Sequence, residues 1–171
     1  MKTLFLLLAL VPFIATHPLS AQNQKAEKAE QLARLFQETR TLIESNRFKV
    51  VIDRVYPQNG MDMTRFNPRG EIVVDDTLVK GNLPFFGRAY SLPYGEGGGI
   101  EFEGPMIEKT VKIKQRKKNK MILYHFSVRG QNDVYQISID IAAGGNCSVD
   151  VSSNNRTHIA YTGNAVPLDE K

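Results

Sequence analysis

The chain has 171 residues, of which 42% are apolar and 23% are charged. This composition supports a folded core and excludes a disordered, fibrous or low-complexity protein, and the length fits one domain better than two. The net charge of +4 is too small to indicate a nucleic-acid-binding protein.

The first 21 residues have the order of a secretory signal peptide. A basic start precedes an apolar stretch at 4–15 and a small-residue cleavage region at 18–21. We predict cleavage after Ala21, which leaves one domain of residues 22–171 in the periplasm or outside the cell. The apolar stretch is shorter than the roughly 20 residues of a membrane-spanning helix. An uncleaved anchor is therefore the less favoured alternative, and no transmembrane segment is expected after cleavage.

Cys147 is the only cysteine in the chain. It lies far from the leader, so no cysteine is available there for a lipid anchor, and a single cysteine forms no intramolecular disulfide. The core alone must therefore stabilise the domain, which is feasible for about 150 residues. We interpret Cys147 as a small buried apolar residue rather than as a catalytic thiol.

One amphipathic helix is expected at residues 24–45. Apolar residues recur there at three-to-four spacing, while the other face carries Lys, Glu, Gln and Arg. We expect the apolar face to pack on the core of the domain rather than to form a cofactor site. This face contains Leu32, Leu35, Phe36, Leu42 and Ile43.

From residue 47 to about residue 162 the apolar period changes to two, which is typical of strands with one buried and one solvated face. The clearest example is 135–141, where Tyr and Ile alternate with Gln, Ser and Asp. Such alternation indicates at least six antiparallel strands rather than parallel ones. The residues predicted to be buried include Phe48, Val50, Ile52, Val111, Ile113, Tyr124, Phe126, Ile137, Ile139, Val149, Val151, Ile159 and Tyr161.

Turn-forming residues separate these strands at hairpin distances. They lie at residues 67–70, 80–82, 117–119, 130–133, 144–146 and 152–155. Neighbouring strands should therefore pair in sequence order. Because seven or eight strands in an open flat sheet would expose their edges, the predicted fold class is mainly β. An antiparallel meander closes into a barrel-like or sandwich domain, with the N-terminal helix packed on it.

The segment 83–99 interrupts the strand rhythm with two prolines, five glycines and several aromatic residues. Loops displayed on rigid sheets often bind ligands, so this loop is the leading candidate for a ligand site. In that hypothesis Arg88 donates hydrogen bonds to a carboxylate or phosphate. The apolar walls would be Phe85, Phe86, Tyr90 and Tyr94. The more common arrangement is that the aromatics cap the barrel and Arg88 bonds backbone carbonyls.

Seven basic residues between positions 109 and 120 predict a lysine-rich hairpin. They are Lys109, Lys112, Lys114, Arg116, Lys117, Lys118 and Lys120. Lysine on an exposed strand commonly serves to prevent edge-to-edge pairing. The alternative is that the hairpin binds an anionic surface, such as lipid headgroups or a polysaccharide.

The sequence offers little support for catalysis. Outside the leader the histidines are His125 and His158, and neither lies in a metal-binding or nucleophile motif. Ser138, Asp140 or Asp150 could join a histidine in space, which sequence alone does not show. We therefore favour a non-enzymatic ligand-binding or cell-envelope-associated module without a metal or cofactor, and a periplasmic hydrolase is the alternative. Its ligand is left open among small molecules, lipids and glycans, and no nucleic-acid partner is expected.

Several short motifs and their order carry a family resemblance. A leader and a helix precede a Leu-Pro-x-Phe-Gly-Arg-Ala-Tyr loop at 83–90, a Gly-Ile-x-Phe strand at 99–102 and a late Tyr-x-Gly strand at 161–163. This combination resembles a family of small exported Gram-negative proteins known only as a domain of unknown function, with a likeness over residues 24–167. The resemblance implies a mainly β, barrel-like domain and an exported location, and it implies no activity, substrate or cofactor.

Overall fold

The computed structural model describes residues 19–66, 69–90, 98–116, 119–131 and 133–168, with the backbone only for 19–23, 66 and 116. Within these ranges one α-helix precedes nine strands. The elements are α1 (Leu19–Glu44), β1 (Arg47–Pro57), the short 3-10 helix η1 (Thr64–Phe66), β2 (Glu71–Asp75), β3 (Leu78–Leu83), β4 (Ile100–Pro105), β5 (Ile107–Arg116), β6 (Asn119–Arg129), β7 (Val134–Ala142), β8 (Asn146–Ser152) and β9 (Ile159–Pro167).

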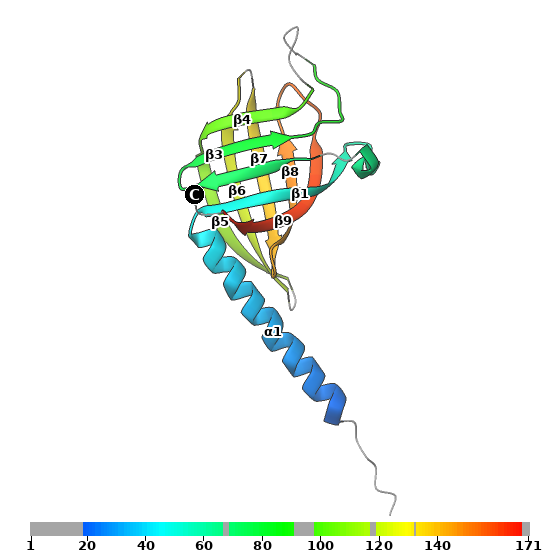
Figure 1. The fold of residues 1–171 in the computed structure, drawn as a ribbon, viewed down its shortest axis with the longest axis vertical. Coiled ribbons are helices and arrows are strands. Elements are labelled where there is room, and N and C mark those ends of the chain that lie inside the picture. Colours follow the sequence, from blue (N-terminus) through cyan, green and yellow to red (C-terminus); the bar gives the residue numbers. More distant parts are fainter. Residues whose placement is uncertain (1–18, 67–68, 91–97, 117–118, 132, 169–171) are drawn as a thin grey trace, which may run out of the picture.

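The nine strands form one antiparallel sheet in the order β4-β3-β2-β1-β9-β8-β7-β6-β5. The sheet curls into a half-barrel, with β1 to β4 lying across β5 to β8 in Figure 1. This confirms the predicted mainly β, antiparallel and barrel-like class. Pairing in sequence order holds with one exception: β4 and β5 lie at opposite edges, and β1 pairs with β9 in the middle. Strands β1 to β4 therefore follow one another from the middle of the sheet to one edge, and β5 to β9 follow one another from the opposite edge back to β1.

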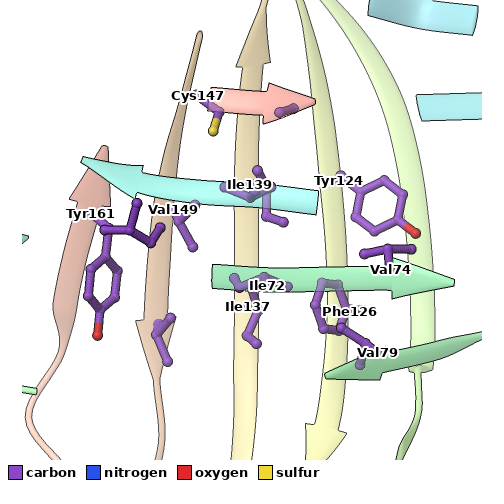
Figure 2. Close-up of a cluster of buried hydrophobic side chains, with 14 of the residues drawn as sticks. Ile72, Val74, Val79, Tyr124, Phe126, Ile137, Ile139, Cys147, Val149 and Tyr161 are labelled. Carbon is purple, nitrogen blue, oxygen red and sulfur yellow. The ribbon is translucent and has the colours of Figure 1, made fainter. Parts of the chain in front are cut away.

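Inner side chains of the two halves meet in a single core. Ile72, Val74 and Val79 from β2 and β3 face side chains of β6 to β8 in Figure 2. Burial of this apolar surface is the main stabilising contribution to the fold. Eleven of the residues predicted to face the core are buried: Phe48, Val50, Ile52, Tyr124, Phe126, Ile137, Ile139, Val149, Val151, Ile159 and Tyr161.

The prediction is wrong for two residues of β5. Val111 is 44% exposed and Ile113 is 48% exposed. They pair with Tyr124 and Ile122, whose side chains are buried, so the alternation places them on the inner face as expected. β5 is however the edge of the sheet. No further strand covers this part of its inner face in the described structure, which leaves both side chains open to solvent.

Residues 80–82 do not form the turn that their sequence predicts. They lie inside β3, and the hairpin between β2 and β3 turns at Asp76 and Thr77 instead. Gly81 is buried under the ring of Phe102, where an added Cβ would lie 2.6 Å from ring carbon Cε1. The glycine therefore makes room for an aromatic ring from the neighbouring strand, a close approach that sequence turn signals do not distinguish from a turn.

α1 begins at Leu19, earlier than predicted, and only its C-terminal half packs on the barrel. Phe36 and Ile43 are buried, and Thr39 accepts a hydrogen bond from the Gly144 N–H at 3.0 Å. Leu32 was also predicted to reach the core, but it is 38% exposed because the helix has left the barrel by that turn. None of the described helices is long and apolar enough to cross a membrane.

Candidate functional site

Residues 83–90, hereafter the strap, are joined to the loop between β8 and β9. The Tyr90 N–H donates to the Asn155 carbonyl at 2.8 Å, and the Thr157 N–H donates to the Arg88 carbonyl at 2.9 Å. The Arg88 N–H donates to the Thr157 hydroxyl at 3.1 Å. These bonds surround an isolated antiparallel bridge between positions 89 and 156. The strap is therefore an added piece of ladder rather than an unattached loop.

Side chains tighten this attachment. The buried Tyr161 hydroxyl donates to the Pro84 carbonyl at 2.8 Å, and burial raises the pKa of this phenol well above its usual range. A Cβ at Gly87 would lie 2.6 Å from Phe85 Cζ and closer still to the Thr157 hydroxyl. A side chain at position 87 would therefore have to displace the ends of the Phe85 and Thr157 side chains, so glycine fits this close approach. The loop motif found in the sequence thus has a structural role.

Arg156 lies beneath the strap and is only 8% exposed. Its guanidinium carbon lies 5.1 Å from the centre of the Phe85 ring, a cation–π contact. Its Nη1 is buried and has no hydrogen-bond partner. No ion pair between Arg156 and a carboxylate is found in the described ranges. Buried charges are normally paired or hydrogen-bonded because desolvation of an unpaired charge is costly.

A second buried polar atom belongs to the same loop. The hydroxyl of Ser153 is buried and lacks a partner, like the guanidinium Nη1 of Arg156. Arg156 also lies close enough to Tyr161 to offset part of the rise in the phenol pKa. The loop between β8 and β9 therefore holds a buried cation and a buried hydroxyl, each with unused hydrogen-bonding capacity.

The side chains predicted to form the ligand site have different surroundings. The Arg88 side chain is exposed, Phe86 is partly buried against the core, and Tyr90 is 69% exposed. Tyr94 lies outside the described residues. Sequence reasoning singled out the segment 83–99 but did not single out Arg156 or Ser153, because an arginine after a run of Ser and Asn is usually on the surface.

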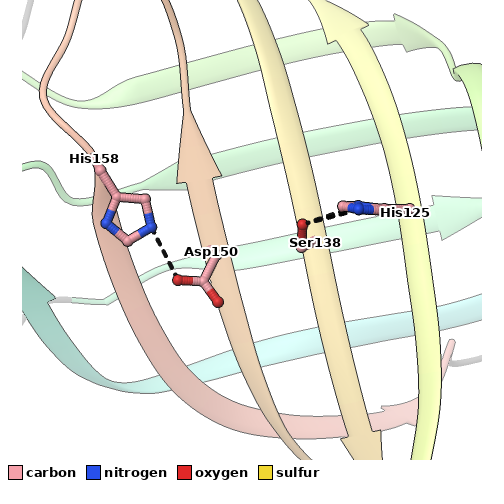
Figure 3. A network of polar contacts seen from close by, with 4 residues as sticks. All are labelled: His125, Ser138, Asp150 and His158. Atoms are coloured by element: carbon pink, nitrogen blue, oxygen red, sulfur yellow. Dashed lines mark hydrogen bonds and ion pairs between the residues drawn. The ribbon is translucent and has the colours of Figure 1, made fainter. Parts of the chain in front are cut away.

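The two histidines lie on the outer face of the sheet (Figure 3). Ser138 Oγ is 2.8 Å from His125 Nδ1, and His158 Nε2 is 2.9 Å from Asp150 Oδ1. Each histidine thus meets a hydroxyl or a carboxylate, and neither meets both. A hydrolytic triad needs one histidine between the two. Among the described residues there is likewise no group of three side chains able to hold a metal ion.

Cys147 is buried, as predicted, and lies among the core side chains of Figure 2. Burial, with a smaller contribution from Asp53, raises the pKa of its thiol to about 12. The thiolate is the reactive form of cysteine, and burial of Cys147 disfavours it.

Comparison with known proteins agrees with the fold. The sequence profile of a domain of unknown function, DUF4251, matches residues 30–165. The chain belongs to the DUF4251 family. This confirms the resemblance to a family of unknown function that the sequence motifs indicated. None of the curated proteins has a sequence that matches this chain.

A solved DUF4251 structure has the same fold. The crystal structure of a DUF4251 family protein from Bacteroides eggerthii DSM 20697 is similar with a TM-score of 0.57 and 18% sequence identity. The similarity covers 81% of this chain and 91% of that chain. At this identity the comparison shows a shared DUF4251 fold and carries no information on activity.

Proposed function

We propose that this protein is a non-enzymatic binding module that holds a small carboxylate or phosphate beneath the strap, with Arg156 as its anchor. The observation that carries this proposal is the buried guanidinium nitrogen without a partner. A bound oxyanion would accept the unused hydrogen bond of Arg156 and neutralise its charge. Arg is well suited to this role because its planar fork matches carboxylate and phosphate oxygens.

Access to Arg156 requires the strap to move. Residues 88–90 are held to residues 155–157 by three hydrogen bonds, two between backbone groups and one to the Thr157 hydroxyl, and short surface segments open at a lower free energy than the core of a domain. Arg88 lies on the strap and is exposed, so it adds a second positive charge near the entrance. Phe86 and Tyr90, with Tyr94 outside the described range, would form the apolar rim of the sequence hypothesis.

The test is a thermal-shift titration of the protein with sodium phosphate and with sodium acetate, each against sodium chloride at matched ionic strength. Ligand binding to the folded state raises Tm with concentration, and the two anions separate the two ligand classes. We expect Arg156→Met to abolish the shift and Arg156→Lys to weaken it. Arg88→Ala should weaken it less, because its charge is solvated. An equal shift for the wild type and Arg156→Met would refute the site.

The proposal includes export of the domain. The predicted leader of residues 1–21 ends within the first turn of α1, which begins at Leu19. Expression in a Gram-negative host followed by intact mass measurement should give a periplasmic chain that starts at Gln22. A periplasmic product that retains Met1 would refute cleavage at this position.

A further inference from the structure

We propose that the end of the protein formed by the β5–β6 hairpin and the free half of α1 docks on an anionic lipid bilayer. This basic end comprises Val111, Lys112, Ile113, Lys114, Lys120 and Leu32. It is separate from the strap, and the inference does not depend on the proposed anion site.

The positive charge of the chain is concentrated in the sequence of the β5–β6 hairpin. Seven of the chain's 22 lysine and arginine residues lie between positions 109 and 120, where the sequence has no acidic residue, and three of them, Lys112, Lys114 and Lys120, belong to the basic end. The remaining 15 are outnumbered by the 18 acidic residues. The molecule therefore carries a localised positive region on an otherwise slightly acidic chain. Such a distribution orients a protein toward an anionic surface.

Apolar side chains lie beside these charges. Val111 and Ile113 are about half exposed on the inner face of β5, and Lys112 and Lys114 are exposed on its outer face. Because β5 is an edge strand, a surface that lies along its free edge meets both rows. Lysines would then contact lipid phosphates while the two aliphatic side chains enter the upper acyl region. The backbone groups of the free edge would stay in the hydrated headgroup layer.

An apolar groove extends this surface onto the helix. A groove of about 880 Å³ separates α1 from the hairpin, with Leu32, Ala33 and Phe36 on the helix side. Asn119 and Lys120 lie on the hairpin side. The Lys120 ammonium is 5.7 Å from the centre of the Phe36 ring. An acyl chain in this groove would place its headgroup phosphate beside Lys120.

The chemistry favours lipid over the other anionic partners. A polysaccharide or an acidic protein would pair with the lysines but would leave the aliphatic residues and the groove uncovered. A second copy of this chain would bring its own lysines against these, which is repulsive along an edge strand. An anionic bilayer alone satisfies the charge and the apolar surface together.

The experiment is co-sedimentation of the protein with vesicles of phosphatidylcholine alone, and with vesicles of phosphatidylcholine and phosphatidylglycerol in equal parts. We expect binding to the anionic vesicles only, and weaker binding as salt rises. The triple change Lys112→Gln, Lys114→Gln and Lys120→Gln should weaken it on the order of 100-fold, since one lysine near an anionic surface contributes about fivefold.

Two further sets of variants provide the controls. Changing Arg69, Lys80 and Arg129 to Gln removes the same charge away from the basic end, and vesicle binding should fall by less than threefold or so, as expected of distant, screened charges. The pair Val111→Thr and Ile113→Thr should weaken vesicle binding but leave binding to soluble dextran sulfate unchanged.

Three outcomes would overturn the proposal. The first is that both triple Gln variants lose vesicle binding to the same extent. The second is that the protein binds dextran sulfate and vesicles equally and that the pair Val111→Thr and Ile113→Thr changes neither. The third is that the wild type does not bind vesicles. If the lysines serve only to prevent edge pairing, the variant with Lys112, Lys114 and Lys120 changed to Gln should self-associate in sedimentation velocity, and the wild type should not bind vesicles.

Discussion

Both ends of the half-barrel place a cation over an aromatic ring, yet they differ in solvation. At the strap end Arg156 lies 5.1 Å from the Phe85 ring and is buried under a segment that hydrogen bonds hold in place. At the basic end Lys120 lies 5.7 Å from the Phe36 ring and remains exposed. The same kind of contact therefore suits a selective ligand site where water is excluded, and a broad docking surface where it is not.

The largest expected change in stability comes from the contact that holds α1 against the barrel. Phe36→Ala should lower the free energy of unfolding by about 3–5 kcal/mol, because it removes a buried ring between α1 and the barrel. Leu32→Ala, one turn earlier, is the matched control and should cost less than about 1 kcal/mol, since that side chain is well exposed. Urea unfolding measures both. Equal losses would mean that the whole helix packs on the barrel in solution.

The strap is tested by Gly87→Ala. The new methyl group would overlap Phe85 and Thr157, so the strap must shift, at a cost of about 1–3 kcal/mol. Gly104→Ala is the control because a Cβ there meets no atom within 4 Å. Hydrogen exchange should show faster exchange at the Tyr90 and Thr157 amides in the Gly87 variant only. Unchanged exchange at both amides would contradict the close approach.

The two cations should respond differently to loss of charge. Replacing Arg156 by Met removes a buried charge that has no ion-pair partner in the described ranges while keeping bulk against Phe85, and such replacements are often neutral or stabilising, here by about 1 kcal/mol. Lys120→Met should change the free energy of unfolding by less than about 0.5 kcal/mol because the ammonium is solvated. Both are measured in a buffer without phosphate or carboxylate. A loss of several kcal/mol at Arg156 would instead show that its charge is satisfied in the folded protein.

Buried titratable groups in the core between the two ends should make the free energy of unfolding depend weakly on pH. Burial raises the pKa of the Cys147 thiol to about 12 from 9.0, so above pH 9 the unfolded chain releases this proton first and binds fewer protons than the folded chain. Stability is therefore full below pH 9 and falls as pH rises toward 12, by about 1 kcal/mol at pH 10 from this group. The buried phenols of Tyr124 and Tyr161, whose pKa values are also raised, act in the same direction at higher pH. Cys147→Val should flatten the decline between pH 9 and 10. An identical slope in the variant would show that the thiol is not desolvated.

The fold class, the helix, most strand faces and the burial of Cys147 could be predicted from the sequence. Each of these follows from local periodicity or from composition: a period of two predicts which side chains of β7 and β8 are buried, whatever those strands contact. Proline, glycine and aromatic residues likewise set the segment 83–90 apart from the regular strands, and the order of several motifs indicated a family of unknown function.

Which of the predicted inner faces are covered depends on the tertiary structure. Val111 and Ile113 have the alternation of core residues, but β5 became an edge because β1 pairs with β9. Gly81 has the composition of a turn, but the ring of Phe102 occupies the space above it. Arg156 has the sequence neighbours of a surface loop, and it is buried because the strap, some 70 residues earlier in the chain, crosses it. Burial at these positions depends on contacts with residues distant in sequence, which local sequence patterns do not predict.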